Sequence, residues 1–237
     1  MNNYFRQYFP NSLTFLSLAC GLLSIILSGQ EYIMWAGSLI LLSVILDILD
    51  GFSARKLEVE SGFGMQLDSL TDMVSFGVAP LILTYQHLAP RDNFSFWILP
   101  FIILPVWAGA FRLARFNLQP PKQSIHNDTV GITITQSGAI LTLAVLSDLS
   151  SINYSLSVGV YIILLLVLSY LMISKLKFPS PTWYFPSKRF FLLYLTIGAV
   201  LAAFSSFFTS ILVLCLGSLA ASISRKIYLL FQDSQAL

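Results

Sequence analysis

Residues 47–72 read DILDGFSARKLEVESGFGMQLDSLTD, and they place two pairs of aspartates inside long apolar stretches. The first pair is Asp47 and Asp50, and the second is Asp68 and Asp72. An aspartate at the centre of a membrane helix costs roughly 2.5–3.5 kcal/mol. Four unpaired aspartates would together cost about 10–14 kcal/mol. Their charge must therefore be offset, and a divalent cation is the natural candidate.

The rest of the chain has the composition of an integral membrane protein. Of its 237 residues, 56% are hydrophobic and only 10% are charged, whereas soluble domains carry about 25% charged residues. No strand-like alternation of period two competes with the long apolar stretches. The sequence therefore predicts an all-α, polytopic transmembrane bundle, with one catalytic domain over residues 1–237 and its motif core at 47–72.

A transmembrane helix needs about 20 mostly apolar residues, and eight segments qualify. They are approximately 12–28, 33–55, 64–87, 94–116, 131–149, 153–174, 189–206 and 208–230. The last two share one apolar stretch, 189–230, which is too long for a single helix. Six spans remain the alternative count.

The lysines and arginines indicate the orientation. With a cytosolic N-terminus and eight spans, all but one of them fall on the cytoplasmic side, as the positive-inside rule requires. These are Arg6, Arg55, Lys56, Arg112, Arg115, Lys122, Lys175, Lys177, Lys188, Arg189, Arg225 and Lys226, with Arg91 outside. We therefore expect both termini in the cytosol and the acidic stretch near the cytosolic face of the cytoplasmic membrane.

Helical geometry brings the acidic residues together. At about 100° per residue, one stripe of the second segment and one of the third carry them. The stripes are Asp47, Asp50, Gly51 and Ala54, with Arg55 at the edge, and Gly64, Asp68, Asp72 and nearby Ser75. The short joint at 56–63 makes the two helices antiparallel neighbours, so their acidic faces can converge.

Converging carboxylates without histidine or cysteine suit hard cations, namely Mg²⁺, Mn²⁺ or Ca²⁺. Four aspartates can hold two ions about 3.5–4 Å apart, an arrangement used for in-line displacement at phosphorus. Gly51 and Gly64 leave room for a phosphate ligand, and the guanidinium of Arg55 matches a phosphate in shape. A single aspartate near a helix end is usually a solvated cap or an ion pair, but that reading does not explain four phased ones.

The pattern Asp47-x2-Asp50-Gly51-x2-Ala54-Arg55-x8-Gly64-x3-Asp68-x3-Asp72 resembles the signature of the CDP-alcohol phosphotransferase family. Residues 112–117, RLARFN, and 171–175, LMISK, followed by Pro179-Ser180, resemble its phosphatidylserine synthase branch. The resemblance implies a homodimeric membrane enzyme that transfers a phosphatidyl group from CDP-diacylglycerol to serine and releases CMP. It also implies two divalent cations, Mg²⁺ or Mn²⁺, as cofactors.

The resemblance further implies roles for particular residues. Asp47, Asp50 and Asp68 would hold one metal, and Asp47, Asp68 and Asp72 the second. Asp72 would also take the proton from the acceptor hydroxyl. The residues implied to contact CDP-diacylglycerol are Gly51, Arg55, Ser61 and Gly64, together with the stretch from Asn11 to Thr14.

Arg112 and Arg115, at i and i+3 near the inner end of the fourth segment, precede Asn117 in the family-like string. They bind the acceptor carboxylate or simply anchor the helix at the membrane surface. Residues 129–138 carry many hydroxyls, which line an acceptor pocket or pack helices, and we favour packing.

Three other readings stay open. Glycerol 3-phosphate or an inositol phosphate as acceptor would keep the fold and the metals, but should need more basic residues around the pocket. A cation transporter would spread its acids across the membrane depth, and a purely structural protein would not phase four aspartates. Membrane lipids are expected partners, and nucleic acids are not.

Overall fold

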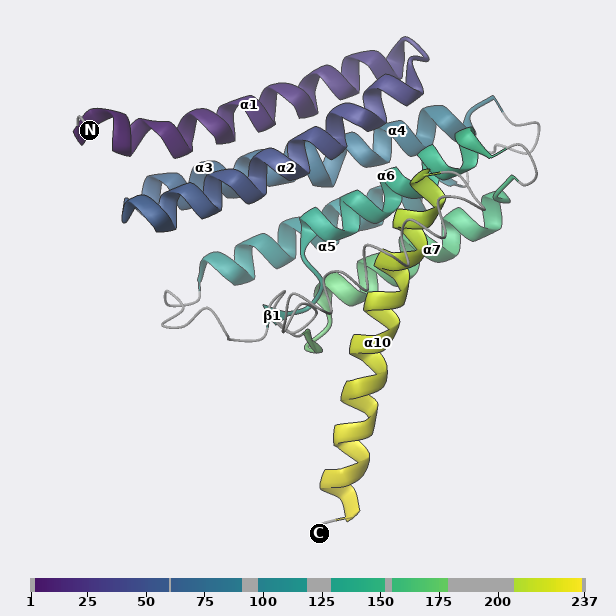
Figure 1. Ribbon diagram of the computed structural model, residues 1–237. Helices are drawn as coiled ribbons and strands as arrows, with labels where there is room; N and C mark the ends of the chain where they lie inside the picture. Colours follow the sequence, from purple (N-terminus) through teal and green to yellow (C-terminus); the bar gives the residue numbers. More distant parts are fainter. Residues whose placement is uncertain are drawn as a thin grey trace.

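The computed structural model is a helical bundle, and it describes residues 3–59, 61–90, 98–118, 129–151, 155–178 and 207–235. The elements in chain order are α1 (Asn3–Gly29), α2 (Ile33–Leu57), α3 (Gly62–Asp72), η1 (Met73–Val78), α4 (Ala79–Leu88), α5 (Leu99–Asn117), β1 (Thr129–Val130), α6 (Ile134–Ser150), α7 (Val158–Ile173), β2 (Lys177–Phe178) and α10 (Phe207–Gln235). Helices α1 to α7 lie roughly side by side, whereas α10 crosses them steeply (Figure 1). The predicted all-helical class is confirmed.

Four helical segments are long and apolar enough to cross a membrane: Tyr8–Gly29, Ile33–Leu57, Gly62–Leu88 and Leu99–Asn117. They match the first four expected spans to within a few residues. Three shorter apolar helices, Ile134–Ser150, Val158–Ile173 and Phe208–Ser224, fall at the expected fifth, sixth and eighth spans. The expected span 189–206 lies outside the described residues. The membrane class is therefore supported, while the count of eight and the cytosolic termini stay predictions.

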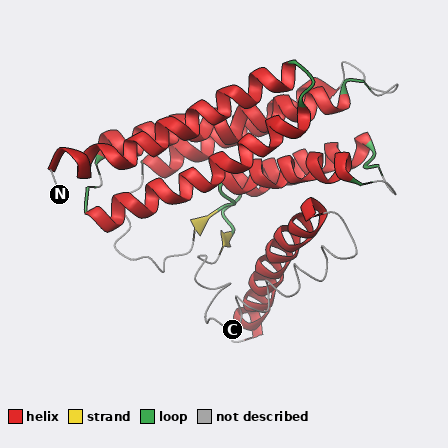
Figure 2. Ribbon diagram, turned by 45° about the horizontal axis from the view of Figure 1, so that its top comes forward, coloured by secondary structure: helices red, strands yellow, loops and turns green. Residues whose placement is uncertain are grey.

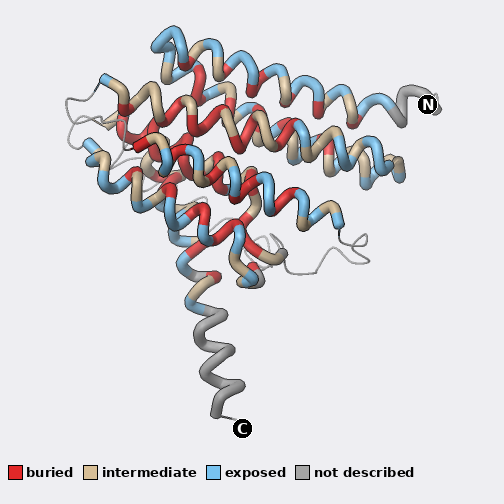
Figure 3. Tube along the Cα trace, turned by 180° about the vertical axis from the view of Figure 1, so that it is seen from behind, coloured by how far each residue is buried: buried red, intermediate tan, exposed pale blue. Residues whose placement is uncertain are grey.

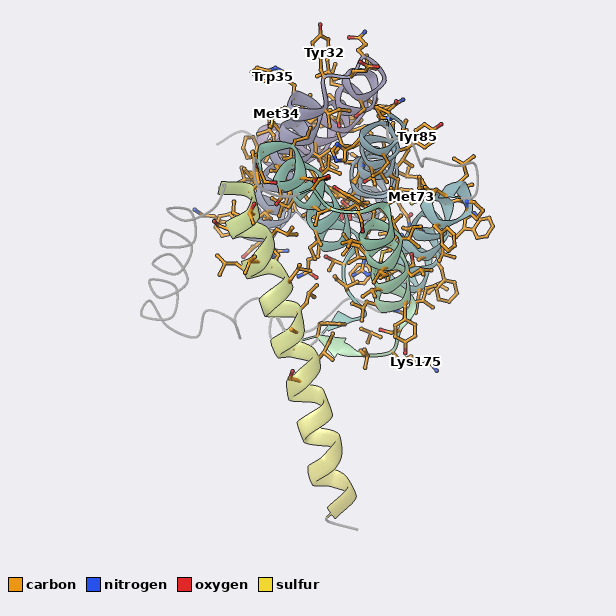
Figure 4. The ribbon with its side chains drawn as sticks, turned by 90° about the vertical axis from the view of Figure 1, so that its right-hand side faces the viewer. Tyr32, Met34, Trp35, Met73, Tyr85 and Lys175 are labelled. Carbon is orange, nitrogen blue, oxygen red and sulfur yellow. The ribbon has the colours of Figure 1, made fainter. Side chains whose placement is uncertain are left out.

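Large apolar side chains cover the outside of the bundle. Trp35 is 70% exposed, Trp107 69% and Ile163 64%, and Figure 4 shows Trp35 at the outer surface. Buried positions follow the inner faces of the helices (Figure 3). A surface with this much exposed apolar area fits contact with lipid rather than with water.

A turn of π-helix, η1, interrupts the third span immediately after Asp72. Pro80 has no N–H to donate to the carbonyl of Phe76, and its ring would clash with that carbonyl in a regular α-helix. The wider π turn accommodates the proline, and such turns are frequent at functional sites. Ser75, expected near the acidic stripe, lies inside this turn, and its Oγ donates to the backbone carbonyl of Ser17 on α1 at 3.2 Å.

Two very short strands, β1 and β2, form between the expected membrane spans. Thr129 and Val130 pair antiparallel with Phe178 and Lys177 respectively (Figure 2). The ladder joins the segment before α6 to the segment after α7, although sequence periodicity indicated no strand. Four residues are too few to show an alternating pattern. Most of residues 117–130 and 175–188 lies outside the described residues.

A second buried polar cluster fastens the C-terminal ends of α4 and α6 to the start of α7. The side chain of Asp148 is 1% exposed, and its Oδ2 lies 2.8 Å from Nε2 of His87. Tyr161 Oη donates to the same oxygen at 3.2 Å, and the backbone N–H of Leu156 donates to Oδ1 at 2.8 Å. This cluster holds helix ends together and lies at the end of the bundle away from the joint between α2 and α3 (Figure 1).

Replacing Gly138 with alanine is expected to destabilise the fold. A Cβ at this position on α6 would lie 2.6 Å from the carbonyl oxygen of Phe76 and 2.9 Å from its Cα. Both atoms are backbone, so relief requires the helices to separate, at about 1–3 kcal/mol. Thermal unfolding in detergent would show a lower midpoint. Gly217→Ala on α10 is the matched control, because nothing lies within 4 Å of its Cβ position. Equal midpoints for the two variants would contradict this packing.

Candidate metal centre

The joint between α2 and α3 reverses the chain in four residues, 58–61, and sets the two helices antiparallel. Glu58 ends α2 in the left-handed conformation, at φ 55°. Ser61 begins α3, and its Oγ accepts a hydrogen bond from the N–H of Gly64 at 3.0 Å. The short joint predicted at 56–63 is confirmed, and it returns α3 past the acidic end of α2.

Three carboxylates from these two helices converge. Asp47 and Asp50 on α2 and Asp68 on α3 each offer one oxygen, and the three oxygens lie within 4.8 Å of one another. Spacing at i and i+3 puts the first two on one face of α2. Three oxygen ligands in this arrangement suit a hard divalent cation, which needs several carboxylate oxygens around it.

Asp72 lies beside this group at the junction of α3 and η1. Its side chain is buried, and a hydrogen bond links its carboxyl group to that of Asp47. Its Oδ1 has no hydrogen-bond partner among the described residues. Two carboxylates this close repel each other unless a proton or a cation lies between them. The orphaned oxygen and the crowded acids therefore fit bound cations.

Two threonine hydroxyls support the acids from neighbouring helices. Thr14 on α1 is buried, and its Oγ1 donates to Oδ2 of Asp50 at 2.7 Å. Thr135, in the first turn of α6, is hydrogen-bonded through its side chain to Asp47. The capping box formed by Thr133 and Gln136 fixes that first turn. Groups of this kind hold metal-binding carboxylates in position.

The residues expected to contact the nucleotide form two groups near the same helix ends. At Gly51, the atoms nearest to a Cβ position belong to the guanidinium of Arg55, the closest at 3.4 Å. At Gly64, they are Ser61 Oγ at 3.2 Å and Asn11 Oδ1 at 3.4 Å. Asn11 lies in the interior of α1, which starts at Asn3 and runs through Pro10, so the helix begins before the first expected span.

The three residues considered for acceptor binding differ in their surroundings. Arg112 is buried, and its Nε has no hydrogen-bond partner in the segments that the structure describes. It interacts electrostatically with Asp72. Arg115 donates instead to the carbonyls of Ile173, Val130 and Met172, at 3.0, 3.1 and 3.4 Å.

Asn117 ties the end of α5 to α3. Its Oδ1 accepts from Ser69 Oγ at 3.2 Å, and its Nδ2 lies 3.5 Å from Gln66 Oε1. Of the three acceptor candidates, the structure therefore brings only Arg112 to the acids.

Thr135 is the site residue that sequence reasoning assigned to helix packing. It lies in a hydroxyl-rich stretch, and no spacing rule separates a packing threonine from one beside a metal centre. The signal was the capping-box pattern Thr133-x-x-Gln136, which marks the start of α6 and therefore the direction in which its first turn points.

Comparison with known proteins agrees with this geometry. Residues 7–166 match the family model for CDP-alcohol phosphatidyltransferase. The chain is 36% identical over 177 residues to the CDP-diacylglycerol–serine O-phosphatidyltransferase of Helicobacter pylori strain J99, covering 73% of this chain and 72% of the relative. It is 37% identical over 178 residues to the enzyme of that name from Methanocaldococcus jannaschii, covering 75% of each. For the Bacillus subtilis enzyme the identity is 34% over 181 residues, covering 73% and 90%. With the family model matching more than half of its length, the chain belongs to the CDP-alcohol phosphatidyltransferase family.

Proposed function

We propose that the protein transfers a phosphatidyl group from CDP-diacylglycerol to the hydroxyl of L-serine, giving phosphatidylserine and CMP. The observation that carries this proposal is the convergence of Asp47, Asp50 and Asp68 beside Asp72, in a chain of this family. The names of its relatives supply serine as the acceptor.

Divalent cations, Mg²⁺ or Mn²⁺, are the proposed cofactors, and the residues fit them. Asp47, Asp50 and Asp68 would hold one ion, and Asp47, Asp68 and Asp72 the second, so that Oδ1 of Asp72 gains the partner it lacks. Bound there, the cations would neutralise charge on the phosphates and polarise the reacting phosphorus.

Asp72 is the proposed base. The serine hydroxyl gives its proton to an oxygen of Asp72 as its own oxygen attacks the phosphorus attached to the glycerol. The bond from that phosphorus to the oxygen bridging the two phosphates breaks, and CMP leaves with the electron pair. The buried position of Asp72 at the π turn excludes water, which would otherwise compete with serine as acceptor.

The donor's CDP group is proposed to lie along the ends of α1, α2 and α3. Arg55 beside Gly51 supplies the fixed positive charge for the phosphates. Asn11, Ser61 and Gly64 lie together at the start of α3 and would contact the remainder of the nucleotide. The acyl chains would remain in the bilayer, along the apolar surfaces of the bundle.

Membrane placement follows from the charges. We place the joint between α2 and α3 at the cytosolic face, with both termini in the cytosol and 189–206 as one of eight spans. Arg55 and Lys56 in the last turn of α2 and Arg115 in the last turn of α5 support this orientation. The cytoplasmic membrane and a homodimer complete the proposal, both by family resemblance.

CMP release from CDP-diacylglycerol tests the acceptor directly. The protein in detergent is supplied separately with serine, glycerol 3-phosphate or an inositol phosphate, and serine is expected to stimulate release. Stimulation by glycerol 3-phosphate alone would overturn the serine assignment.

A cation pathway is not favoured, because the buried Asp148 at the far end of the bundle is held by His87 and Tyr161.

Replacing Thr14 with valine is expected to weaken metal binding without unfolding the protein. The change removes the hydroxyl that donates to Asp50 and keeps the volume of the side chain. Loss of such a supporting group typically costs about 10- to 100-fold in metal affinity or activity. The measurement is the Mn²⁺ concentration that gives half-maximal CMP release. Ser38→Ala is the control, since Ser38 on α2 is exposed and donates within its own helix, to the carbonyl of Met34. An unchanged Mn²⁺ requirement in Thr14→Val would contradict the role.

A further inference from the structure

Arg112 is a buried cation whose hydrogen-bonding capacity is incompletely used. Its side chain is 7% exposed, and its Nε has no hydrogen-bond partner within the part of the chain that the structure describes. Buried charges are normally paired and fully hydrogen-bonded because their desolvation is expensive. The arginine attracts Asp72, which is itself incompletely bonded through Oδ1. Arg112 and Asp72 thus carry opposite charges, and each has an atom without a hydrogen-bond partner among the described residues. Such a pair is suited to a ligand that carries both a carboxylate and a hydroxyl.

The contacts around Arg112 place it at the same spot as the acids. One turn earlier on α5, a Cβ on Gly109 would lie 2.6 Å from Ile134 Cδ1 at the start of α6. The next residue on α6, Thr135, bonds to Asp47, which in turn bonds to Asp72. Helix α5 and the first turn of α6 therefore meet beside the acidic group, and Arg112 on α5 interacts electrostatically with Asp72.

Two described cations near this end of the bundle, Arg115 and Lys175, are engaged elsewhere or exposed. Arg115 donates to three main-chain carbonyls. A Cβ on Gly131, at φ 76°, would lie 3.2 Å from Nη2 of Arg115, so the guanidinium is packed tightly against this turn. Lys175 is exposed and points outward from the bundle (Figure 4). Arg112 is thus the cation that the described residues present to the acceptor side of the acids.

We propose that Arg112 binds the carboxylate of the acceptor and thereby selects an amino alcohol that carries a carboxylate. The inference rests on the proposed function and adds the specificity of the same site. A guanidinium binds a carboxylate through two parallel hydrogen bonds. In serine the carboxylate and the hydroxyl are separated by two carbon atoms, so the adjacent Arg112 and Asp72 can contact both at once. One fixed positive charge suits a carboxylate, whereas a phosphate dianion would call for more.

The test compares L-serine with L-serinamide, in which a neutral amide replaces the carboxylate. kcat/KM is measured for both acceptors with the wild type, Arg112→Met, Arg112→Lys and the control Lys175→Met. We expect Arg112→Met to lower kcat/KM for serine at least about tenfold more than for serinamide, as loss of a charge-assisted hydrogen bond predicts. Arg112→Lys keeps the positive charge but cannot form the two parallel hydrogen bonds of a guanidinium. Its kcat/KM for serine is expected to lie between those of the wild type and Arg112→Met. Lys175→Met is expected to keep the wild-type ratio.

Binding is measured separately with L-alanine, which has the carboxylate but no hydroxyl and so cannot react. Its inhibition constant against serine is expected to rise in Arg112→Met by a factor similar to the rise in the KM for serine. An equal fall for serine and serinamide, with an unchanged alanine constant, would show that Arg112 acts only through Asp72 and would overturn the proposal. Wild-type protein that uses both acceptors equally well would overturn it too. Wild-type protein inactive with serine would instead refute the proposed function.

Discussion

Asp72→Asn is expected to lower kcat by roughly 10²–10⁴-fold, the usual contribution of a general base, and by more if the change also displaces a cation. The amide keeps the shape of the carboxyl group, but it has no lone pair basic enough to take the proton of the acceptor hydroxyl. The side chain is buried and attracts the buried Arg112, so the stability of the variant is measured beside its activity. The measurement is CMP release under saturating substrate and metal, together with the thermal unfolding midpoint.

Asp148→Asn is the matched control for that result. Asp148 is a buried aspartate at the opposite end of the bundle, and its carboxylate accepts hydrogen bonds from Tyr161 and the backbone of Leu156. The same isosteric change there is expected to lower the unfolding midpoint and to leave the kcat of the folded protein intact. Asp72→Asn should therefore lower kcat, whereas Asp148→Asn should lower the unfolding midpoint. Wild-type turnover in Asp72→Asn would remove Asp72 as the base.

Removing divalent cations is expected to abolish activity, and the acids of α2 and α3 should set the concentration that restores it. Treatment with a chelator should reduce CMP release to the uncatalysed level, and Mg²⁺ or Mn²⁺ should restore it. Asp68→Asn should raise the Mn²⁺ concentration for half-maximal activity at least about tenfold, since even outer groups of metal sites contribute that much. Asp68 is the ligand from α3 in the three-carboxylate group, and an amide is a neutral and weaker donor.

Glu58→Gln provides the comparison for Asp68→Asn. Glu58 is an exposed carboxylate in the joint between the same two helices, and it ends α2 through its backbone conformation. Glu58→Gln removes one negative charge at the same end of the two helices and leaves the converging oxygens of Asp47, Asp50 and Asp68 unchanged. An equal shift in the Mn²⁺ requirement of both variants would mean that overall charge, and not ligation, governs metal binding.

The convergence of the aspartates could be predicted from the sequence because it depends on local geometry. Asp47 and Asp50 share a face of α2 through helical periodicity, and four joining residues allow only an antiparallel return of α3. Hydropathy likewise located the first four spans, because the bilayer fixes the length of an apolar helix. Neither result needs knowledge of a distant contact.

The positions that sequence reasoning missed depend on residues far away in the chain. Arg112 and Arg115 have the same type and lie three residues apart, but the partners of Arg115 are carbonyls of β1 and α7. A main-chain carbonyl leaves no mark in the sequence, so the two arginines could not be told apart. The π turn at residues 73–78 was not predicted, because Pro80, which favours it, lies outside the acidic motif. Thr135 approaches Asp47 because α6 packs on α2, where a Cβ on Gly37 would lie 2.7 Å from Leu146 Cδ2.

Crystals soaked in manganese would test the central claim most directly, which is that acids of α2 and α3 together hold the ions for phosphatidyl transfer. Anomalous diffraction is expected to show two peaks about 3.5–4 Å apart between the helices. Carboxylate oxygens of Asp47, Asp50, Asp68 and Asp72 should surround them. A map without manganese between α2 and α3, or with these four side chains turned away from one another, would contradict the account.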